Sequence, residues 1–301
     1  MSKKLSKDVF SVVVTYEPDL KTLKNVLLSL VEQVKSTVVI DNGSSIRGLC
    51  GLVDTFKGKV QLIRLNRNHG IAKAHNEGIL IARRQGASFV LLMDQDSIPE
   101  NDMVAKLAQA VSAIPKIGSV GPRYVDRRQN NPPPFIRIEG IRLKREKCED
   151  ENALVPVDYL ISSGCLIPMS VLDAVGPMRE ELFIDYVDIE WGLRAKSCGF
   201  QNYGVCNAKM SHSLGSDPLL FLGRRIPLHN PVRHYYHFRN AIWLYKQPWV
   251  PKNWKIVDGW RLLRKYVFYS LFTHRRLEHL RMMTLGLIHG FKGRMGPLTN
   301  A

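Results

Sequence analysis

The chain has 301 residues, of which 45% are hydrophobic and 23% charged, and this composition excludes an intrinsically disordered protein. Its net charge is +16, but residues 209–301 carry sixteen basic against three acidic residues, so this end holds +13 and residues 1–208 are nearly neutral. A basic end on a neutral body favours a local anionic partner, such as a membrane face, and argues against a nucleic-acid-binding protein.

Two further features bear on the location of the protein. No stretch reaches ~18 consecutive apolar residues, so we expect no membrane-spanning helix. The first residues, M-S-K-K-L-S-K-D, have no apolar core, so we expect no signal peptide. The cysteines are odd in number and lack C-x-x-C spacing, which predicts reduced thiols in a cytosolic protein rather than a disulfide framework or a zinc site. They are Cys50, Cys148, Cys165, Cys198 and Cys206.

The first hundred residues alternate between strand and helix patterns. Strands are predicted at 12–16, 37–41, 60–65 and 89–93, and helices at 20–34 and 71–84. Strands separated by helices predict an α/β fold with a doubly wound, mostly parallel sheet and right-handed crossovers. Neither G-x-G-x-x-G after the first strand nor a Walker sequence is present, which argues against an NAD enzyme and a P-loop ATPase.

The second half of the chain is less regular. Residues 118–157 lose the periodicity and are predicted to form a long excursion, whereas 183–200 hold an acidic cluster followed by a helix. From Lys252 onward apolar and basic residues mix in a helical pattern. We therefore expect a main α/β domain at 1–245, with halves at about 8–120 and 121–245, and a basic amphipathic helical tail at 246–301.

Two carboxylates follow the fourth strand in the segment F-V-L-L-M-D-Q-D-S. Asp94 and Asp96 fall at the carboxyl end of a buried strand, where open α/β sheets bind their ligands. A divalent cation with oxygen ligands, holding a diphosphate, would explain the two charges. The alternative is that Asp94 ends the strand while Asp96 and Ser97 cap a helix starting near Pro99.

Polar residues also follow the other strands. Thr15, Glu17 and Asp41 lie after the first two strands, so three strand ends converge on one crevice that suits a nucleotide. The alternative for Asp41 is a simple Asp-Asn-Gly turn. The next helix opens with polar or flexible residues that favour an anionic ligand, or else form an ordinary helix start with an exposed lysine. These are Asn68, Gly70, Lys73 and Asn76.

With these pieces in order, the chain resembles glycosyltransferase family 2 with the GT-A fold, and within it the bacterial L-rhamnosyltransferases. The resemblance runs from about Val12 to Leu298. It is carried by V-V-V-T-Y-E-P-D, V-V-I-D-N-G-S, N-H-G-I-A-K-A-H-N-E-G, L-L-M-D-Q-D-S, I-S-S-G-C-L-I-P, F-I-D-Y-V-D-I-E-W-G-L-R-A and R-H-Y-Y-H-F-R-N. It implies a dTDP-L-rhamnose donor, a divalent metal (Mg²⁺ or Mn²⁺) and inversion at the sugar carbon.

The resemblance also implies roles for individual residues. Asp94 and Asp96 would bind the metal together with His212, and Asp188 would be the catalytic base. Many family members have Glu just before this Asp, where this chain has Val187, which leaves Asp185 as a second acid. Asn76 would lie near the donor, Arg239 would bind the diphosphate, and the acceptor would contact Ser163, Gly164, Asp185 and Glu190. Each role has an alternative. The acids at 185–190 would favour the start of a helix, His212 would be a structural histidine, and Arg239 would lie on a basic helix face.

The basic tail suits a helix lying on an anionic membrane surface, although a helix packed on the catalytic domain or on a dimer partner would show the same pattern. Membrane contact would fit a glycan or glycolipid acceptor and a peripheral location at the inner face of the bacterial cell membrane. The oligomeric state stays open. Competing functions are transfer of another nucleotide sugar and a non-catalytic membrane or nucleic-acid binding module, which would have no use for Asp94, Asp96, Asp188 and His212.

Overall fold

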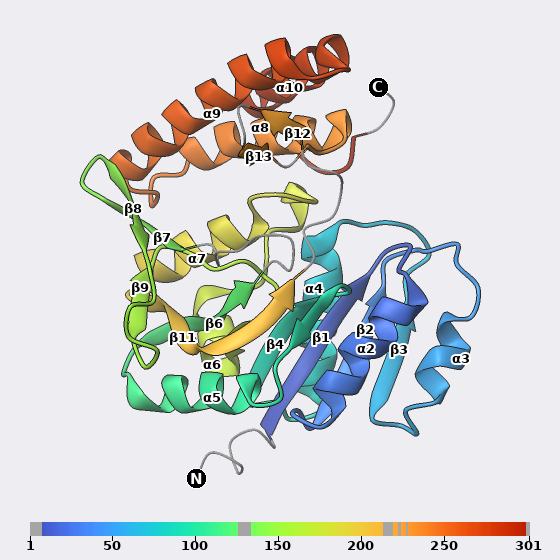
Figure 1. The fold of residues 1–301 in the computed structure, drawn as a ribbon. Helices are drawn as coiled ribbons and strands as arrows, with labels where there is room; N and C mark the ends of the chain where they lie inside the picture. The colour runs from blue at the N-terminus through green and yellow to red at the C-terminus, as the bar shows by residue number, and fades with distance from the viewer. Residues whose placement is uncertain (1–7, 126–133, 213–218, 222–223, 227, 299–301) are drawn as a thin grey trace.

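The computed structural model describes residues 8–125, 134–212, 219–221, 224–226 and 228–298, without the side chains of residues 212–227. Its centre is a sheet in which nine strands fall within the described residues (Figure 1). They are β1 (Val9–Thr15), β2 (Ser36–Asp41), β3 (Val60–Arg64), β4 (Phe89–Asp94), β5 (Ser97–Pro99), β6 (Ile117–Val125), β9 (Leu154–Val157), β10 (Cys165–Pro168) and β11 (Gln201–His212). Their order is β3-β2-β1-β4-β10-β6-β11-β5, and β9 pairs with β11.

The N-terminal half of this sheet is parallel, as the alternating sequence predicts. Val12 of β1 lies opposite Val38 of β2 on one side and Leu92 of β4 on the other. The carboxyl ends of β1, β2 and β4 therefore meet at one edge of the sheet. β10 runs antiparallel to β4 and β6, and β5 runs antiparallel to β11, so the sheet is mixed beyond β4. The predicted fold class is confirmed.

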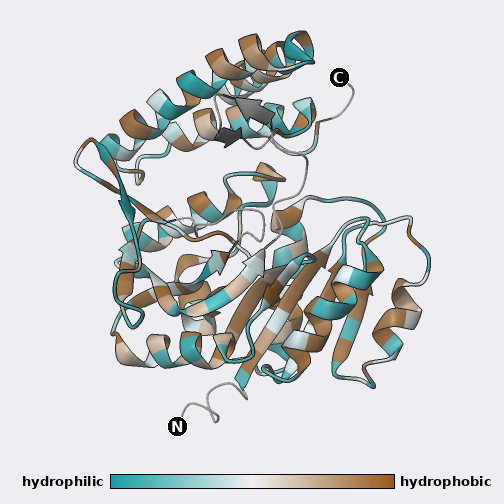
Figure 2. Cartoon of the chain, viewed as in Figure 1, coloured by the Kyte–Doolittle hydropathy of each residue, from teal (hydrophilic) through white to brown (hydrophobic). Residues whose placement is uncertain are grey.

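Helices cover both faces of the sheet. They are α2 (Leu20–Val31), α3 (Leu49–Asp54), α4 (Ile71–Arg84), α5 (Met103–Ala113), α6 (Met169–Val175) and α7 (Val187–Ser197). Because side chains alternate along a strand, Val12 and Val14 join a core with α4, α6 and α7, while Val13 joins one with α2, α3 and α5. Figure 2 shows the central strands as largely hydrophobic, as expected for a sheet buried on both faces.

The structure of the segment after the D-Q-D sequence excludes the alternative in which Asp96 and Ser97 cap a helix. Residues Ser97–Pro99 form the short strand β5, and α5 begins only at Met103. Asp96 and Ser97 therefore do not cap a helix that starts near Pro99. The residues that follow Asp94 instead return to the sheet edge and pair with β11.

The excursion at 118–157 contains more regular structure than its sequence predicts. It includes β6, the hairpin of β7 (Phe135–Glu139) and β8 (Arg142–Glu146), and β9. Cys148 forms a disulfide with Cys206 of β11, 58 residues away in sequence. The prediction of reduced thiols is therefore wrong for these two cysteines, which the antiparallel pairing of β9 with β11 brings together. Cys50, Cys165 and Cys198 are free thiols.

Three helices form a separate layer above the sheet domain (Figure 1): α8 (Pro231–Tyr245), α9 (Lys252–Phe272) and α10 (Arg276–Lys292). The layer has its own apolar core, which includes Phe238, Trp254 and Met283. α10 packs closely on α8 because Gly286 and Gly290 face the α8 backbone without side chains. The remaining elements are η2 (Glu180–Leu182) and the hairpin β12 (Leu219–Phe221) and β13 (Arg224–Ile226). None of the described helices is both long and apolar enough to cross a bilayer.

Candidate active site

The ends of β1 and β2 hold a buried carboxylate in a polar network. Asp41 is fully buried and accepts hydrogen bonds from Thr15 Oγ1 at 3.3 Å and from Ser44 Oγ. Arg64 Nε lies 3.0 Å from Asp41 Oδ2 and completes an ion pair. The sequence reasoning did not identify Arg64, although its place at the end of β3, opposite Asp41, was a usable signal. A second nitrogen of the Arg64 guanidinium donates to the Ser44 carbonyl at 3.0 Å, and the side chain is 47% exposed.

The loops after β1, β2 and β4 are joined by hydrogen bonds. Glu17 accepts from the backbone N–H and the hydroxyl of Ser45, both at 2.8 Å, and these bonds lower the pKa of Glu17. The backbone N–H of Tyr16 donates to Gln95 Oε1 at 2.8 Å, and Gln95 Nε2 donates to the Tyr16 carbonyl at 3.3 Å. Gln95, the middle residue of D-Q-D, thus ties the two acids to the first loop.

The start of α4 connects the crevice to the acidic segment at 183–190. Asn68 Oδ1 accepts from the Gly70 N–H at 2.9 Å and from Asn42 Nδ2 at 3.1 Å, which joins the loops after β2 and β3. Gly70 has φ +86°, and a side chain there would overlap Phe183. The Ile71 N–H donates to the Phe183 carbonyl at 2.7 Å, so the two segments touch directly.

Lys73 and Asn76 of α4 contact the chain at residues 178–180, at the start of η2. Lys73 Nζ lies 2.9 Å from Glu77 Oε1 and 3.5 Å from Glu180 Oε1, and the bond to Glu77 raises the pKa of Lys73. Asn76 exchanges two hydrogen bonds of 2.9 Å with the backbone of Met178. These contacts support the chain at 178–180, and none of them is a free donor directed at the crevice.

The D-Q-D acids lie beside the predicted acceptor residues. The Asp94 N–H donates to Ser163 Oγ at 3.2 Å, and the Gly164 N–H donates to the Leu92 carbonyl at 2.8 Å. Ser163 and Gly164 are both buried, and their hydrogen bonds hold the end of β4 in place. This arrangement brings the residues predicted for acceptor and metal to one place.

For His212, the third predicted metal ligand, the structure describes only the backbone. His212 pairs with Ser97 in the β11–β5 ladder, directly after Asp96, and its side chain lies outside the described residues. Among the described side chains, no three of His, Cys, Asp or Glu form a metal-binding group. Two carboxylates and a neighbouring imidazole-bearing residue are nevertheless donors that suit Mg²⁺ or Mn²⁺.

The acidic segment is a strained turn held from α8. Phe183, Asp185 and Tyr186 have φ of 65°, 62° and 63°, values that cost free energy for residues other than glycine. Asn240 Nδ2 donates to three carbonyls of this turn, those of Leu182 at 2.9 Å, Ile184 at 2.8 Å and Asp185 at 2.9 Å. The sequence reasoning missed Asn240, which stands beside Arg239 in R-H-Y-Y-H-F-R-N.

Arg239 supports the same turn instead of facing the crevice. Its side chain is fully buried and donates to the carbonyls of Leu182 at 2.9 Å, Glu181 at 3.2 Å and Gly296. Every described contact of the guanidinium is therefore internal. These contacts favour a structural role for Arg239 over the predicted contact with the diphosphate.

Asp188 follows the strained turn, in the first turn of α7. Its Oδ1 accepts from the Ile189 N–H at 2.9 Å. Burial raises the pKa of Asp188 to about 6, and the carboxylates of Asp185 and Asp94 add to this effect. Asp185 itself forms a fork with Arg233 at 3.1–3.2 Å. Asp188 thus has the environment of a general base that titrates close to neutral pH.

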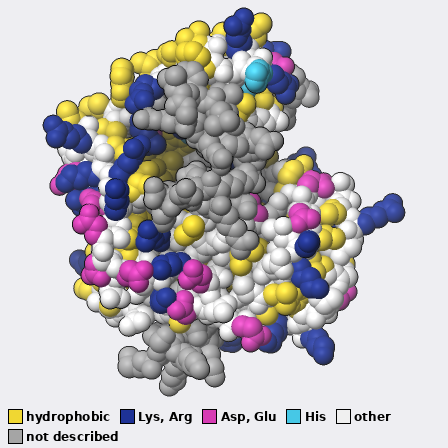
Figure 3. All heavy atoms as spheres, in the orientation of Figure 1, with side chains coloured by type: hydrophobic (Ala, Val, Ile, Leu, Met, Phe, Trp, Pro, Cys, Tyr) yellow, Lys and Arg dark blue, Asp and Glu magenta, His cyan; other side chains and the backbone are white. Residues whose placement is uncertain are grey.

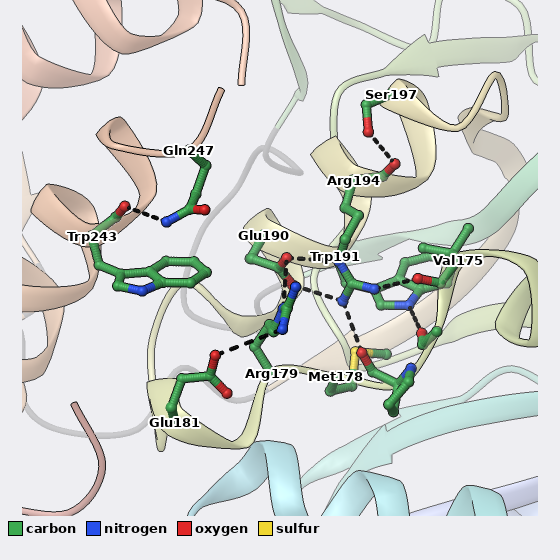
Figure 4. Close-up of polar contacts among 12 residues, drawn as sticks. Val175, Met178, Arg179, Glu181, Glu190, Trp191, Arg194, Ser197, Trp243 and Gln247 are labelled. Atoms are coloured by element: carbon green, nitrogen blue, oxygen red, sulfur yellow. Dashed lines mark hydrogen bonds and ion pairs between the residues drawn. The ribbon is translucent and has the colours of Figure 1, made fainter. Parts of the chain in front are cut away.

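Glu190 is surrounded by two arginines, Arg179 and Arg194 (Figure 4). It is fully buried and pairs in a fork with Arg194 at 2.7 and 2.9 Å, with Arg179 at 3.9 Å. Arg194 also donates to the carbonyls of Val175 and Pro177, so the pair joins α7 to the chain after α6. Both Glu190 oxygens accept hydrogen bonds from Arg194, which favours a structural role over the predicted contact with the acceptor.

A cavity of about 760 Å³ lies between α8 and α9, with Asp185 in its wall. Its described lining combines apolar and aromatic side chains with four cations: Arg233, Arg261, Arg264 and Lys265. Burial lowers the pKa of Lys265 to about 8, and the charge of Arg261 acts in the same direction. Asp185 is the one acid among the described residues of this lining.

Comparison with known proteins agrees with this geometry. The sequence model of the family described as Glycosyl transferase family 2 matches residues 11–174. The dTDP-rhamnosyl transferase RfbF of Shigella flexneri is 34% identical over 302 residues, covering 97% of this chain and 98% of the relative.

Two solved structures show the same fold. Staphylococcus aureus TarS 1–349 in complex with UDP-GlcNAc matches with a TM-score of 0.60 at 15% identity, covering 94% of this chain and 81% of that one. GalNAc-T7 with UDP, GalNAc and Mn²⁺ matches with a TM-score of 0.58 at 13% identity, covering 88% and 57%. With the family match and the full-length relative, these likenesses lead to one conclusion: the chain belongs to glycosyl transferase family 2 and is a glycosyltransferase.

Proposed function

We propose that this glycosyltransferase moves L-rhamnose from dTDP-L-rhamnose, with inversion, to a hydroxyl of a lipid-linked glycan in surface polysaccharide biosynthesis. The full-length similarity to a dTDP-rhamnosyl transferase supports the choice of donor. The observation that carries the proposal is the environment of Asp188, a carboxylate with a raised pKa in the first turn of α7, directly after the strained turn. Inverting transfer needs one such base and no covalent intermediate.

The donor would lie along the ends of β1, β2 and β4. The exposed Glu17 would accept hydrogen bonds from the thymine or ribose, and the partly exposed Arg64 would face the diphosphate. The buried Asp41 and Thr15 would support this surface by holding Arg64 and the strand ends in place. Asp94, Asp96 and His212 are the residues that would hold a divalent cation. When bound, the cation would stabilise the negative charge of the departing dTDP.

The acceptor would approach from the side of Asp188. The acceptor hydroxyl would give its proton to Asp188 as its oxygen attacks the sugar carbon from the face opposite the diphosphate, and this geometry inverts the configuration. Ser163 and Gly164 would support the floor of this site through their bonds to β4. The Asp185–Arg233 fork would hold the wall nearest the helical layer.

Donor turnover tests the proposal directly. With Mg²⁺ or Mn²⁺, the protein is expected to release dTDP from dTDP-L-rhamnose at least about tenfold faster than it releases UDP from UDP-GlcNAc, and EDTA should abolish both reactions. Release of nucleotide is measured by chromatography, and heat-denatured protein is the control. A preference for UDP-GlcNAc would contradict the donor assignment, and full activity in EDTA would contradict the metal.

The outer side of α9 supports a location at the membrane surface. Ile256, Trp260, Leu263, Val267 and Leu271 are each about half exposed or more and recur at helical spacing along one stripe. Figure 3 shows hydrophobic side chains gathered along the edge formed by α9 and α10, with basic residues beside them. Apolar residues flanked by cations are the combination that binds an anionic bilayer.

The cavity between α8 and α9 supports an anionic, lipid-linked acceptor. Four cations and several aromatic side chains line it, and the one described acid is already paired with Arg233. Because several cations that line one cavity are stabilised by a nearby anion, this cavity suits a phosphate group carried on a hydrocarbon chain. The same cavity borders Asp185, three residues before the proposed base, so a glycan attached to that phosphate could extend toward Asp188.

Membrane association is tested by flotation with vesicles of phosphatidylglycerol and phosphatidylcholine. The double variant Trp260→Glu, Leu263→Glu is expected to lower the bound fraction about tenfold, since it places charge on the apolar stripe. Leu28→Glu with Leu80→Glu is the matched control, because these exposed leucines lie on α2 and α4. Equal flotation of the two double variants would contradict the assignment of α9 as the membrane face.

A further inference from the structure

A buried histidine on α4 has no role in the site described so far. His75 is 1% exposed, and within the described residues neither of its ring nitrogens has a hydrogen-bond partner. Burial lowers the pKa of His75 to about 4, so the ring is neutral near pH 7. A neutral imidazole offers one N–H donor and one nitrogen acceptor. Buried polar groups in folded proteins are almost always satisfied, so a partner is expected for both.

A small cavity lies against this ring. Its volume is about 20 Å³, enough for one water molecule, and its walls include both His75 and Asp188. Ser119 and Ser162 also line it, and the remaining walls are largely apolar, including Leu92 and Trp191. A cavity that admits one water and has several polar groups in its wall meets the usual requirements for an ordered internal water. It is thus distinct from an empty apolar void.

We propose that one internal water occupies this cavity and bridges His75 to the carboxyl group of Asp188, which makes His75 a positioning residue for the base. The inference rests on the proposed function, in which Asp188 accepts the acceptor's proton. The water would take or give one hydrogen bond at His75 and donate another to the Asp188 carboxylate. Ser119 Oγ already donates to Asn202 Oδ1 at 2.9 Å, so its lone pairs are left to accept from the same water.

The bridge would complete the support of the carboxyl group. In the described structure Asp188 Oδ1 has one fixed donor, the Ile189 N–H at 2.9 Å, which leaves rotation about the side chain weakly restrained. A second hydrogen bond from the cavity side would hold the carboxylate in one rotamer. Proton transfer requires the base to lie within hydrogen-bond reach of the hydroxyl. Loss of the bridge would therefore lower kcat and leave the affinity for the donor nearly unchanged.

The test compares two substitutions of His75 that differ in polarity. His75→Leu removes both polar atoms and is expected to lower kcat about tenfold, with KM for dTDP-L-rhamnose unchanged within about twofold. His75→Gln keeps a donor and an acceptor and is expected to recover kcat to within about threefold of wild type. Ile79→Ala, one turn further along α4 in the apolar core, is the matched packing control and should keep wild-type kcat.

Ser162→Ala provides a second probe of the cavity should His75→Leu fail to fold. It should lower kcat by about threefold, and a high-resolution crystal structure should show one water contacting His75 and Asp188. Equal kcat for the Leu and Gln variants, or a cavity without water in that structure, would overturn the inference. If Asp188→Asn retains activity, the proposed base is wrong. If Asp188→Asn is inactive but both His75 variants behave as wild type, only the water bridge is wrong.

Discussion

Replacing Asp188 by Asn is expected to lower kcat about a thousandfold while leaving the affinity for dTDP unchanged within about twofold. The amide has nearly the same shape but cannot accept the acceptor's proton, so the loss should appear in the chemical step. Steady-state kinetics gives kcat, and calorimetric titration with dTDP reports the nucleotide site. Asp173→Asn is a matched control, because Asp173 lies on the surface of α6 and pairs with Arg83. A comparable loss in that control would remove the special role of Asp188.

The pH dependence belongs to the same prediction. Because the base must be ionised, kcat should rise as pH increases through about 6, the raised pKa of Asp188. A carboxyl whose pKa is raised on folding contributes stability only while it is protonated in the fold, and this contribution is lost as pH rises through about 6. Asp188→Asn should therefore melt at a higher temperature than wild type at pH 8 and show little difference at pH 4. A lower melting temperature at pH 8 would contradict this reasoning.

Replacing Asn240 by Leu is expected to impair both folding and activity. The substitution leaves the carbonyls of Ile184 and Asp185 without their donor, whereas the carbonyl of Leu182 keeps its hydrogen bond from Arg239. Unpaired carbonyls cost about 1–3 kcal/mol each, so we expect a loss of about 3 kcal/mol in the free energy of unfolding. The turn positions Asp185 and Asp188, so kcat of the folded protein should fall about a hundredfold. Urea unfolding and steady-state kinetics measure the two effects.

A surface asparagine provides the control for Asn240. Asn253 donates a single exposed hydrogen bond to the Gly140 carbonyl at 2.9 Å, so Asn253→Leu should change stability by less than about 1 kcal/mol and leave kcat unaltered. Wild-type kcat in folded Asn240→Leu would show that the strained turn keeps its shape without the clamp. The role assigned to Asn240 would then be wrong.

The parallel half of the sheet could be predicted because its signals are local. A strand such as Phe89–Asp94 begins with a continuous apolar run, and the strands of this half are separated by segments of helical periodicity. That pattern fixed the crevice, since strand ends of a parallel sheet share one edge. The hairpin at 135–146 and the Cys148–Cys206 disulfide lay beyond such reasoning, because they depend on which distant segments pair.

The sequence could predict which charged residues lie near the site, but it could not predict which of them face a ligand and which serve internal contacts. Asp41 and the D-Q-D acids stand at strand ends, where the fold itself dictates a ligand site. Glu190 and Arg239 carry the same kinds of charge but serve internal contacts with Arg194 and with backbone carbonyls. No spacing rule separates a buried ion pair from a ligand-binding charge when the partner lies on another element. Asn240, which donates to the carbonyls of the strained turn, was hidden for the same reason.

The central claim is that one carboxylate, Asp188, acts as a base in a single displacement at the sugar carbon. The most direct measurement is the anomeric configuration of the transferred sugar, determined by NMR of the product made from dTDP-L-rhamnose and a lipid-linked acceptor. We expect a configuration opposite to that of the donor in the product of the wild-type protein, and almost no product from Asp188→Asn. Retention of the donor's configuration would require two successive displacements, and it would contradict the role of Asp188 as the base of a single displacement.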